Sequence, residues 1–144
     1  MNIRRIVRHL GMTGWKVGRL FPRKTLHAIE QAIADSEATH GGQICFAVEG
    51  ALDGPSLLRN QSARERAIEV FSHLRVWDTE QNNGVLIYVL LADHDVEIIV
   101  DRGLHARVPT HEWEKICRQM ETAFRAGEYE QGVIDGIQAV SQLL

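Results

Sequence analysis

One uninterrupted apolar run, Val85 to Leu91 (VLIYVLL), constrains the fold of this chain more than any other feature of its sequence. A membrane-spanning helix needs about 20 apolar residues, so this run is far too short to cross a bilayer. A strand with one wet face would alternate apolar and polar residues, and this run does not. The run therefore predicts a central β-strand with both faces buried.

The residues around this run predict two further strands. Residues 92–95 (ADHD) form a short polar break, and Val96 to Val100 (VEIIV) follows as a second strand-like segment. Such a break between two apolar segments is typical of a hairpin of antiparallel strands. Gln43 to Glu49 (QICFAVE) alternates in the manner of a strand and predicts the third.

Helical periodicity fills most of the remaining chain, and Ser62 with Glu65 has the spacing of a capping box. The predicted helices are residues 3–10, 22–40, 62–74, 110–126 and 128–144, and the predicted loops are residues 50–55, 76–83 and 101–109. Helices must cover both faces of a doubly buried strand. We therefore predict an α/β fold: a three-layer helix-sheet-helix sandwich with a small mixed sheet of three to four strands, including one hairpin. Residues 22–144 would form this single domain, and residues 1–21 a basic amphipathic N-terminal helix or arm.

Charge is distributed unevenly along the chain. The net charge of the 144 residues is −3, which argues against a nucleic-acid-binding protein. The first 29 residues nevertheless contain seven basic side chains and no acidic one, and an apolar stripe runs along the first predicted helix. Such a helix can lie on an anionic membrane surface or contact a protein partner; a helix docked on the domain and a flexible basic arm are the alternatives. The residues predicted to make the membrane or partner contact are Arg4, Arg5, Arg8 and Trp15.

The sequence also carries signals about the compartment. Its start lacks the continuous apolar segment and the small-residue cleavage site of a secretory signal. Cys45 and Cys117 are too few for a disulfide scaffold, and we expect them to be buried thiols in a reducing compartment. We therefore expect a cytoplasmic protein, held peripherally at the inner face of the membrane.

Familiar catalytic motifs are missing from the sequence. It contains no Walker-type loop, no dinucleotide fingerprint and no Gly-x-Ser-x-Gly elbow. His111-Glu112 begins like a zinc-binding helix, but Lys115 stands where the second histidine would be needed. Oxygen-rich loops near strand ends remain, and these can hold calcium, which takes about six to eight oxygen ligands. The carboxylates in such loops are Glu49, Asp53, Asp78, Glu80 and Asp101.

The order of several short motifs resembles the TPM domain family. These motifs are Trp77…Asn83-Gly84-Val85-Leu86-Ile87, then Arg102-Gly103-Leu104, and later Phe124-x-x-Gly127-x-Tyr129-x-x-Gly132. The resemblance extends from about Leu26 to the C-terminus and implies an α/β sandwich, calcium binding and a weak acid phosphatase activity. Two positions depart from the family pattern: Asn82 replaces the usual acid of Asp-Asn-Gly, and His105 replaces the glutamate after Gly-Leu.

Three hypotheses about function follow. The first is a TPM-domain module without a catalytic constellation that binds a partner or ligand at the strand-end loops, through Asn83, Arg102 and His105. The second is a divalent-metal-dependent, acid-phosphatase-like phosphoester hydrolase, in which Asp78, Asn82 and Asp101 would hold the cation, calcium being the first candidate. The third is a structural subunit of a larger envelope or membrane assembly. All site predictions require the loops around residues 78–84 and 101–105 to meet at one lip.

Overall fold

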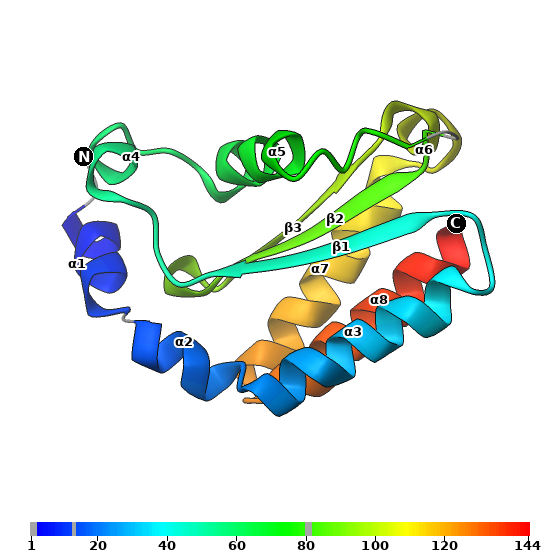
Figure 1. Cartoon of the computed structure of the whole chain (residues 1–144). Coiled ribbons are helices and arrows are strands. Elements are labelled where there is room, and N and C mark those ends of the chain that lie inside the picture. The colour runs from blue at the N-terminus through cyan, green and yellow to red at the C-terminus, as the bar shows by residue number, and fades with distance from the viewer. Residues whose placement is uncertain (1–2, 13, 80–81) are drawn as a thin grey trace.

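A three-stranded mixed sheet forms the centre of the protein (Figure 1). The structure is a computed structural model that describes residues 3–12, 14–79 and 82–144. The strands are β1 (Gln43–Glu49), β2 (Gly84–Leu90) and β3 (Asp95–Val100), in the order β1-β2-β3. β1 pairs with β2 in parallel, and β2 pairs with β3 in antiparallel fashion, which confirms the mixed sheet and the hairpin.

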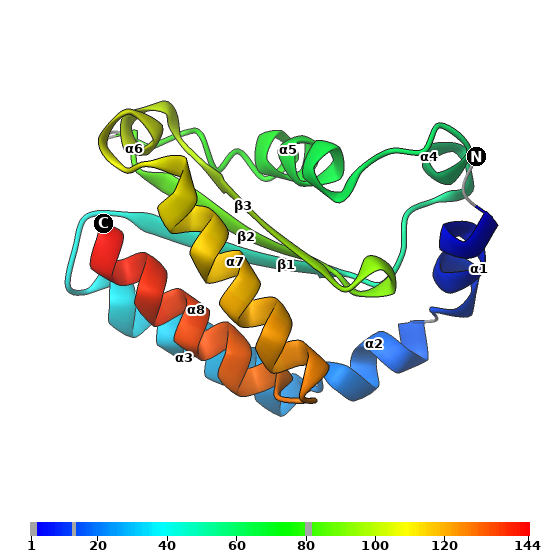
Figure 2. The same cartoon turned by 180° about the vertical axis from the view of Figure 1, so that it is seen from behind.

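Helices cover both faces of this sheet, and the predicted three-layer sandwich is confirmed (Figures 1 and 2). α3, α7 and α8 lie on one face, α4 and α5 lie on the other, and α6 lies at one end. The helices are α1 (Ile3–Gly11), α2 (Gly14–Leu20), α3 (Arg23–Glu37), α4 (Gly54–Leu58), α5 (Ala63–His73), α6 (Arg102–Arg107), α7 (Thr110–Arg125) and α8 (Tyr129–Leu143).

Every residue of β2 is buried, as the apolar run predicts. Val85, Ile87 and Val89 belong to the core that includes the inner faces of α3, α7 and α8. The alternate residues of β2 point to the opposite face and pack in a second core with α4 and α5. Burial of each large apolar side chain contributes roughly 1.5–3 kcal/mol, so this strand anchors both layers.

A carboxylate occupies one outward-pointing amide on each edge strand of the sheet. At the β1 edge, Glu37 Oε2 at the end of α3 accepts a hydrogen bond from the Ile44 amide at 2.9 Å. At the β3 edge, Glu121 Oε2 on α7 accepts from the Val96 amide at 3.0 Å. These amides point away from β2, and without these contacts each would be an unpaired donor on an edge strand.

The last motif of the family resemblance, Phe124-x-x-Gly127-x-Tyr129-x-x-Gly132, lies where α7 and α8 cross. A Cβ on Gly136 would lie 2.5 Å from Met120 Sδ, and one on Gly132 would lie 2.9 Å from Ala123 Cβ. Glycine at these positions therefore lets the two helices approach closely. Phe124 and Tyr129 stack beside this crossing, with ring centroids 5.1 Å apart.

The structure corrects two predicted loops. Residues 101–109 contain α6, because the Asp101 side chain accepts from the Arg102 amide at 2.8 Å and Leu104 is completely buried. Residues 50–55 contain the start of α4, and Asp53 caps it by accepting from the Ser56 amide at 2.8 Å. The predicted capping box at the start of α5 is confirmed.

Candidate functional site

The strand directions decide which predicted site residues can meet. Since β1 and β2 are parallel and β3 is antiparallel to them, the amino ends of β1 and β2 share an edge with the carboxyl end of β3. We call this edge the lip and define it as residues 41–42, 78–79, 82–84 and 101–105. The lip brings together the loops before β2 and after β3, as the site prediction requires. Glu49 ends β1 and Asp53 follows it, so both lie at the opposite edge, and Glu80 falls outside the described residues.

Hydrogen bonds join the loops of the lip to one another. Asp101 Oδ2 accepts from the Thr79 hydroxyl at 3.2 Å, and Thr79 Oγ1 accepts from the Asn83 amide at 3.1 Å. Asn83 Nδ2 donates to the Gly41 carbonyl at 2.9 Å, and the Asp101 amide donates to the Gly84 carbonyl at 2.9 Å. Asp101 and Asn83 are both buried, so these bonds satisfy polar groups that water does not reach.

Backbone crossings at the lip explain two glycines of the family resemblance. A Cβ on Gly84 would lie 2.1 Å from the Val76 carbonyl oxygen, and one on Gly103 would lie 2.6 Å from the Asn82 carbonyl oxygen. Asn82 has a positive φ of 52°, a conformation that asparagine adopts more readily than most residues. The Asn-Asn-Gly and Arg-Gly-Leu motifs therefore serve chain packing.

The described carboxylates of the lip do not gather at one point. Each Asp101 oxygen accepts a hydrogen bond, from the Arg102 amide and from the Thr79 hydroxyl, and Asp78 pairs with Arg75 at 3.3 Å on the surface. Asn82 contributes an amide and no charge. Within residues 3–12, 14–79 and 82–144, no three His, Cys, Asp or Glu side chains converge on one point.

The predicted ligand-binding residues separate around α6. Asn83 lines a hollow of about 250 Å³ with His40 and Arg107, whereas His105 faces a different pocket of about 260 Å³ on the far side of α6. Arg102 is exposed at the start of α6. Neither of these two pockets, which described residues line, contains all three residues predicted to share one ligand.

At the opposite edge, α1 docks on the tip of the β2–β3 hairpin, and the Asp93 carboxylate accepts most of its side-chain hydrogen bonds; Arg5 also donates to Asn60 Oδ1 at 3.3 Å and Arg8 to the Ala92 carbonyl at 3.2 Å. Asp93 accepts from Arg5 Nε at 2.9 Å and from His9 Nε2 at 2.8 Å, and Arg8 approaches it at 3.4 Å. The His9 Nδ1 atom accepts from the Leu52 amide at 2.9 Å, so the buried ring donates to Asp93 from Nε2. Burial opposes ionisation of Asp93, but the hydrogen bonds from Arg5 and His9 outweigh it and hold the pKa of that carboxyl below its usual range.

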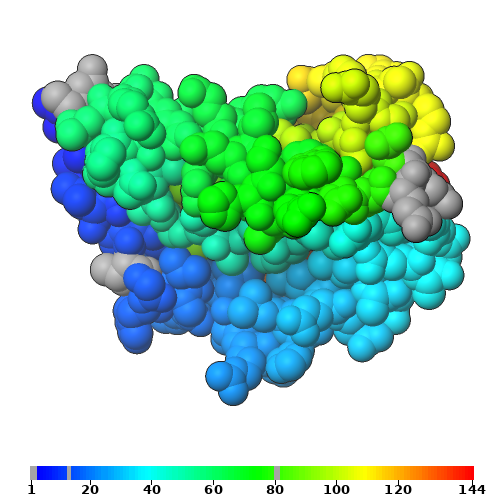
Figure 3. All heavy atoms as spheres, turned by 45° about the horizontal axis from the view of Figure 1, so that its top comes forward, coloured from blue at the N-terminus to red at the C-terminus, as the bar shows by residue number. Residues whose placement is uncertain are grey.

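This docking reverses the usual orientation of an amphipathic helix. Arg5 is buried, so of the predicted contact residues Arg4, Arg8 and Trp15 remain at least partly available. Ile3, Val7 and Leu10 face outward instead, whereas Ile6 packs against the second core. In the space-filling view α1 lies at the edge of the molecule, beside the segment that contains α4 (Figure 3). Sequence periodicity had identified an amphipathic helix but missed Asp93 and His9, whose pairing across 84 residues has no local signal.

These features define a class of protein: a helix-sheet-helix α/β domain in which main-chain segments cross closely at two glycines of the lip. Its first helix presents an apolar stripe to solvent. Residues 18–143 match the model of the TPM domain, and the chain belongs to the TPM domain family. Among curated proteins, none matches the chain.

Solved structures agree with this assignment. The BA42 protein from the psychrophilic bacterium Bizionia argentinensis is 30% identical, with a TM-score of 0.73 over 84% of this chain and 79% of that one. The N-terminal domain of a P. gingivalis protein is 18% identical, with a TM-score of 0.70 over 87% of this chain and 76% of that one. The N-terminal domain of cg2496 from Corynebacterium glutamicum is 11% identical, with a TM-score of 0.61 over 83% and 71%; these last two show the fold alone.

Proposed function

We propose that the chain is a TPM-domain binding module that attaches peripherally to an anionic membrane surface, at the cytoplasmic face, through α1 and α2. One observation carries the proposal: four large apolar side chains of these short helices are turned to solvent. Their exposed fractions are 71% for Ile3, 61% for Val7, 74% for Leu10 and 70% for Trp15.

The spacing of these residues supports a planar contact. Ile3, Val7 and Leu10 are separated by four and three positions, so they form one stripe along α1. A helix of a folded domain normally buries such a stripe, whereas α1 buries Arg5 and His9 on another face. An apolar stripe that a domain leaves exposed marks a surface for a further contact.

Charge favours a lipid surface over other contacts. Arg4 and Arg8 on α1 and Arg19 on α2 accompany the apolar side chains, and Arg19 lies 5.1 Å from the centre of the Trp15 ring. A basic side chain near an anionic bilayer contributes about 1 kcal/mol, and tryptophan favours the headgroup region. None of the described helices is long and apolar enough to cross a bilayer. The family model begins at residue 18, so α1 is a feature of this chain beyond the matched domain.

Sedimentation with lipid vesicles tests the proposal. We expect the whole chain to bind vesicles that contain an anionic lipid and to bind neutral vesicles far more weakly. The variant Val7→Ser/Leu10→Ser should bind at least about ten-fold more weakly, because burial of each such side chain contributes roughly 1.5 kcal/mol or more. Leu74→Ser is the matched control, since Leu74 is 53% exposed on the chain outside α1 and α2.

Two results would contradict lipid binding. One is equal vesicle binding by Val7→Ser/Leu10→Ser and Leu74→Ser. The other is a wild-type chain that does not bind anionic vesicles but self-associates in size-exclusion chromatography, while the double variant is monomeric. The stripe would then be a contact between protein chains.

The hydrolase hypothesis lacks a comparable supporting observation, because the described lip does not gather the carboxylates that it needs. It remains testable. An aryl phosphate assay should compare wild type with Asp101→Asn, each with calcium and with magnesium. A metal-dependent rate that Asp101→Asn abolishes, in a variant that retains its fold, would revive the hypothesis.

A further inference from the structure

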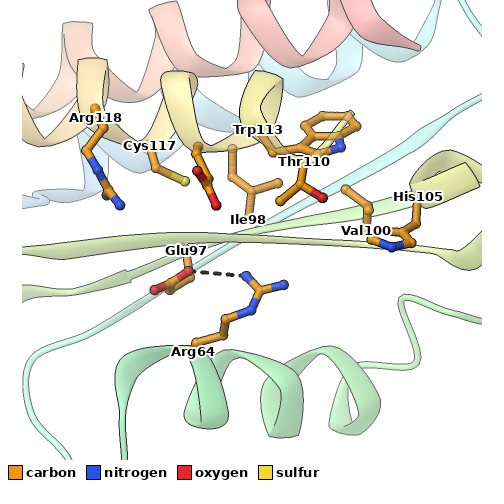
Figure 4. A pocket seen from close by; sticks show the side chains of 10 residues that line it. Arg64, Glu97, Ile98, Val100, His105, Thr110, Trp113, Cys117 and Arg118 are labelled. Carbon is orange, nitrogen blue, oxygen red and sulfur yellow. Dashed lines mark hydrogen bonds and ion pairs between the residues drawn. The ribbon is translucent and has the colours of Figure 1, made fainter. Parts of the chain in front are cut away.

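The outer edge of β1 is open over most of its length, whereas α7 covers the outer edge of β3. On β3, Glu121 accepts from the Val96 amide, and the Cys117 sulfur hydrogen-bonds the Ile98 backbone. The Cys117 side chain extends from α7 toward this strand (Figure 4). No described helix lies in front of β1 in the view of Figure 1, and each residue of Cys45–Glu49 keeps part of its surface exposed.

Backbone groups of this stretch point away from the sheet. The Ile44 amide donates outward, to Glu37 at 2.9 Å. Backbone groups two residues apart in a strand point the same way, so Phe46 and Val48 also direct their N–H and C=O groups outward. In the part of the chain that the structure describes, no backbone or side-chain group pairs with these donors and acceptors. They are therefore available to another extended main chain.

Two contacts limit the length of this opening. At one end lies the carboxylate that occupies the Ile44 amide. At the other end, a Cβ on Gly50 would lie 2.6 Å from Val17 Cγ2 and 3.0 Å from Met12 Cγ, so side chains of α2 and of Met12 cover the end of the strand. The opening, Cys45–Glu49, is therefore about 16 Å long. The β1 strand of a second copy has seven residues and would meet both barriers, whereas a shorter segment would not.

The side chains of the opening are mostly apolar. Phe46 packs against the first core, and Ala47 packs against the second core on the opposite face of the sheet. Glu49 is the one charged residue of the stretch, and Arg66 already holds its carboxylate at 2.8 and 3.0 Å. The Tyr88 hydroxyl donates to the same carboxylate at 2.7 Å. The strand itself therefore offers main-chain partners and apolar side chains.

We propose that Cys45–Glu49 binds a short, extended and largely apolar peptide segment of a partner protein, which pairs with Phe46 and Val48 as a fourth strand of the sheet. An extended peptide repeats a donor and an acceptor at the two-residue spacing of these outward groups. In this mode of recognition the main chain gives affinity, and the neighbouring side chains select the sequence. Peptide binding here does not require the lipid contact of α1 and α2.

Amide hydrogen exchange of the whole chain, followed by NMR, tests this pairing. In the free chain the Phe46 and Val48 amides should exchange rapidly, whereas the Cys45 and Ala47 amides, which face β2, should exchange slowly. The probe is the capped pentapeptide acetyl-Val-Thr-Val-Thr-Val-amide, with an expected Kd of roughly 1 mM. At about ten times its Kd, it should slow exchange of Phe46 and Val48 about ten-fold. The same peptide with N-methyl groups on two adjacent central residues cannot pair fully through either edge and should have no effect.

A matched pair of proline variants locates the contact. Proline removes an amide hydrogen and is tolerated at outward positions of edge strands. Val48→Pro should abolish the protection of Phe46 by the peptide, whereas Val100→Pro, at an outward position of β3, should leave it unchanged. If Val48→Pro does not fold, the comparison of the two peptides on the wild-type chain still decides.

Three results would overturn the peptide contact. Slow exchange of Phe46 and Val48 in the free chain at every concentration would mean that this edge is already covered. Equal effects of the two peptides, or no effect of either, would exclude main-chain pairing. Protection that appears without peptide as the chain concentration rises would assign the edge to a second copy instead.

Discussion

Replacing Asp93 by asparagine should release α1 from the domain while leaving the sandwich intact. The carboxylate is only 12% exposed and is shared by Arg5, Arg8 and His9. Arg5 is itself 10% exposed, so the substitution removes one counter-charge from a buried guanidinium. Breaking a buried pair from one side costs about 3–5 kcal/mol, whereas the half-exposed Arg8 adds little. We expect α1 docking to weaken by about 3 kcal/mol, which increases the undocked population roughly 150-fold.

Two assays without lipid measure this release. Trypsin cleaves after arginine, so cleavage after Arg5 and Arg8 should accelerate strongly in Asp93→Asn, provided that undocking limits the rate. Amide hydrogen exchange of residues 3–12 should accelerate to the same extent, while exchange in β2 stays slow.

A matched substitution provides the control and the refutation. Asp78→Asn also removes one carboxylate from an arginine pair, but Asp78 and Arg75 are 58% and 69% exposed, and such surface pairs contribute little. Asp78→Asn should therefore leave α1 protected. If the amides of residues 3–12 exchange as slowly in Asp93→Asn as in Asp78→Asn, other contacts hold α1 and the docking argument is wrong.

Three further predictions concern the interior. Gly84→Ala should prevent folding or destabilise the domain by more than about 3 kcal/mol, because its Cβ would collide with a main-chain oxygen, whereas Gly18→Ala in the open middle of α2 should be neutral or slightly stabilising in thermal unfolding. Burial, helped by neighbouring carboxylates, raises the pKa of Asp95 to about 7, above its unfolded value near 4. The folded state therefore binds this proton more tightly, so stability falls as pH rises from about 4 to 7. Asp95→Asn should flatten that part of the melting-temperature profile, and a profile identical to wild type would contradict it. Cys117 should resist a thiol reagent until the protein unfolds, and Cys45, which is less buried, should react first.

Local sequence patterns predicted those parts of the fold that depend on neighbouring residues. The unbroken apolar run from Val85, short and rich in β-branched residues, favours a strand buried on both faces, and it forms β2. The capping box at Ser62 depends on residues three apart and is likewise present. The composition of residues 101–109 is typical of a loop, so the sequence did not predict α6. Six residues give too few helical repeats to recognise, and the start of α6 depends on the Asp101 cap.

These local patterns could not predict contacts between residues far apart in the sequence. Strand direction places Glu49 and Asp101 at opposite edges of the sheet, although each stands at the C-terminal end of a strand. Helical periodicity gives α1 an apolar face but not its orientation, which a carboxylate 88 residues after Arg5 determines. The two loops do meet at the lip. The sequence could not show that Thr79, Asn83 and Asp101 hydrogen-bond to one another and so join these loops.

The carboxylates of Glu37 and Glu121 act as terminators of strand addition. Each occupies an outward amide that a neighbouring copy would need for pairing, one at either border of the sheet. A three-stranded sheet with open borders would be a template for fibril growth at high local concentration, such as on a crowded surface. In this chain a helix that covers the sheet supplies the carboxylate at each border, so a further strand could pair fully with β1 or β3 only by displacing that side chain.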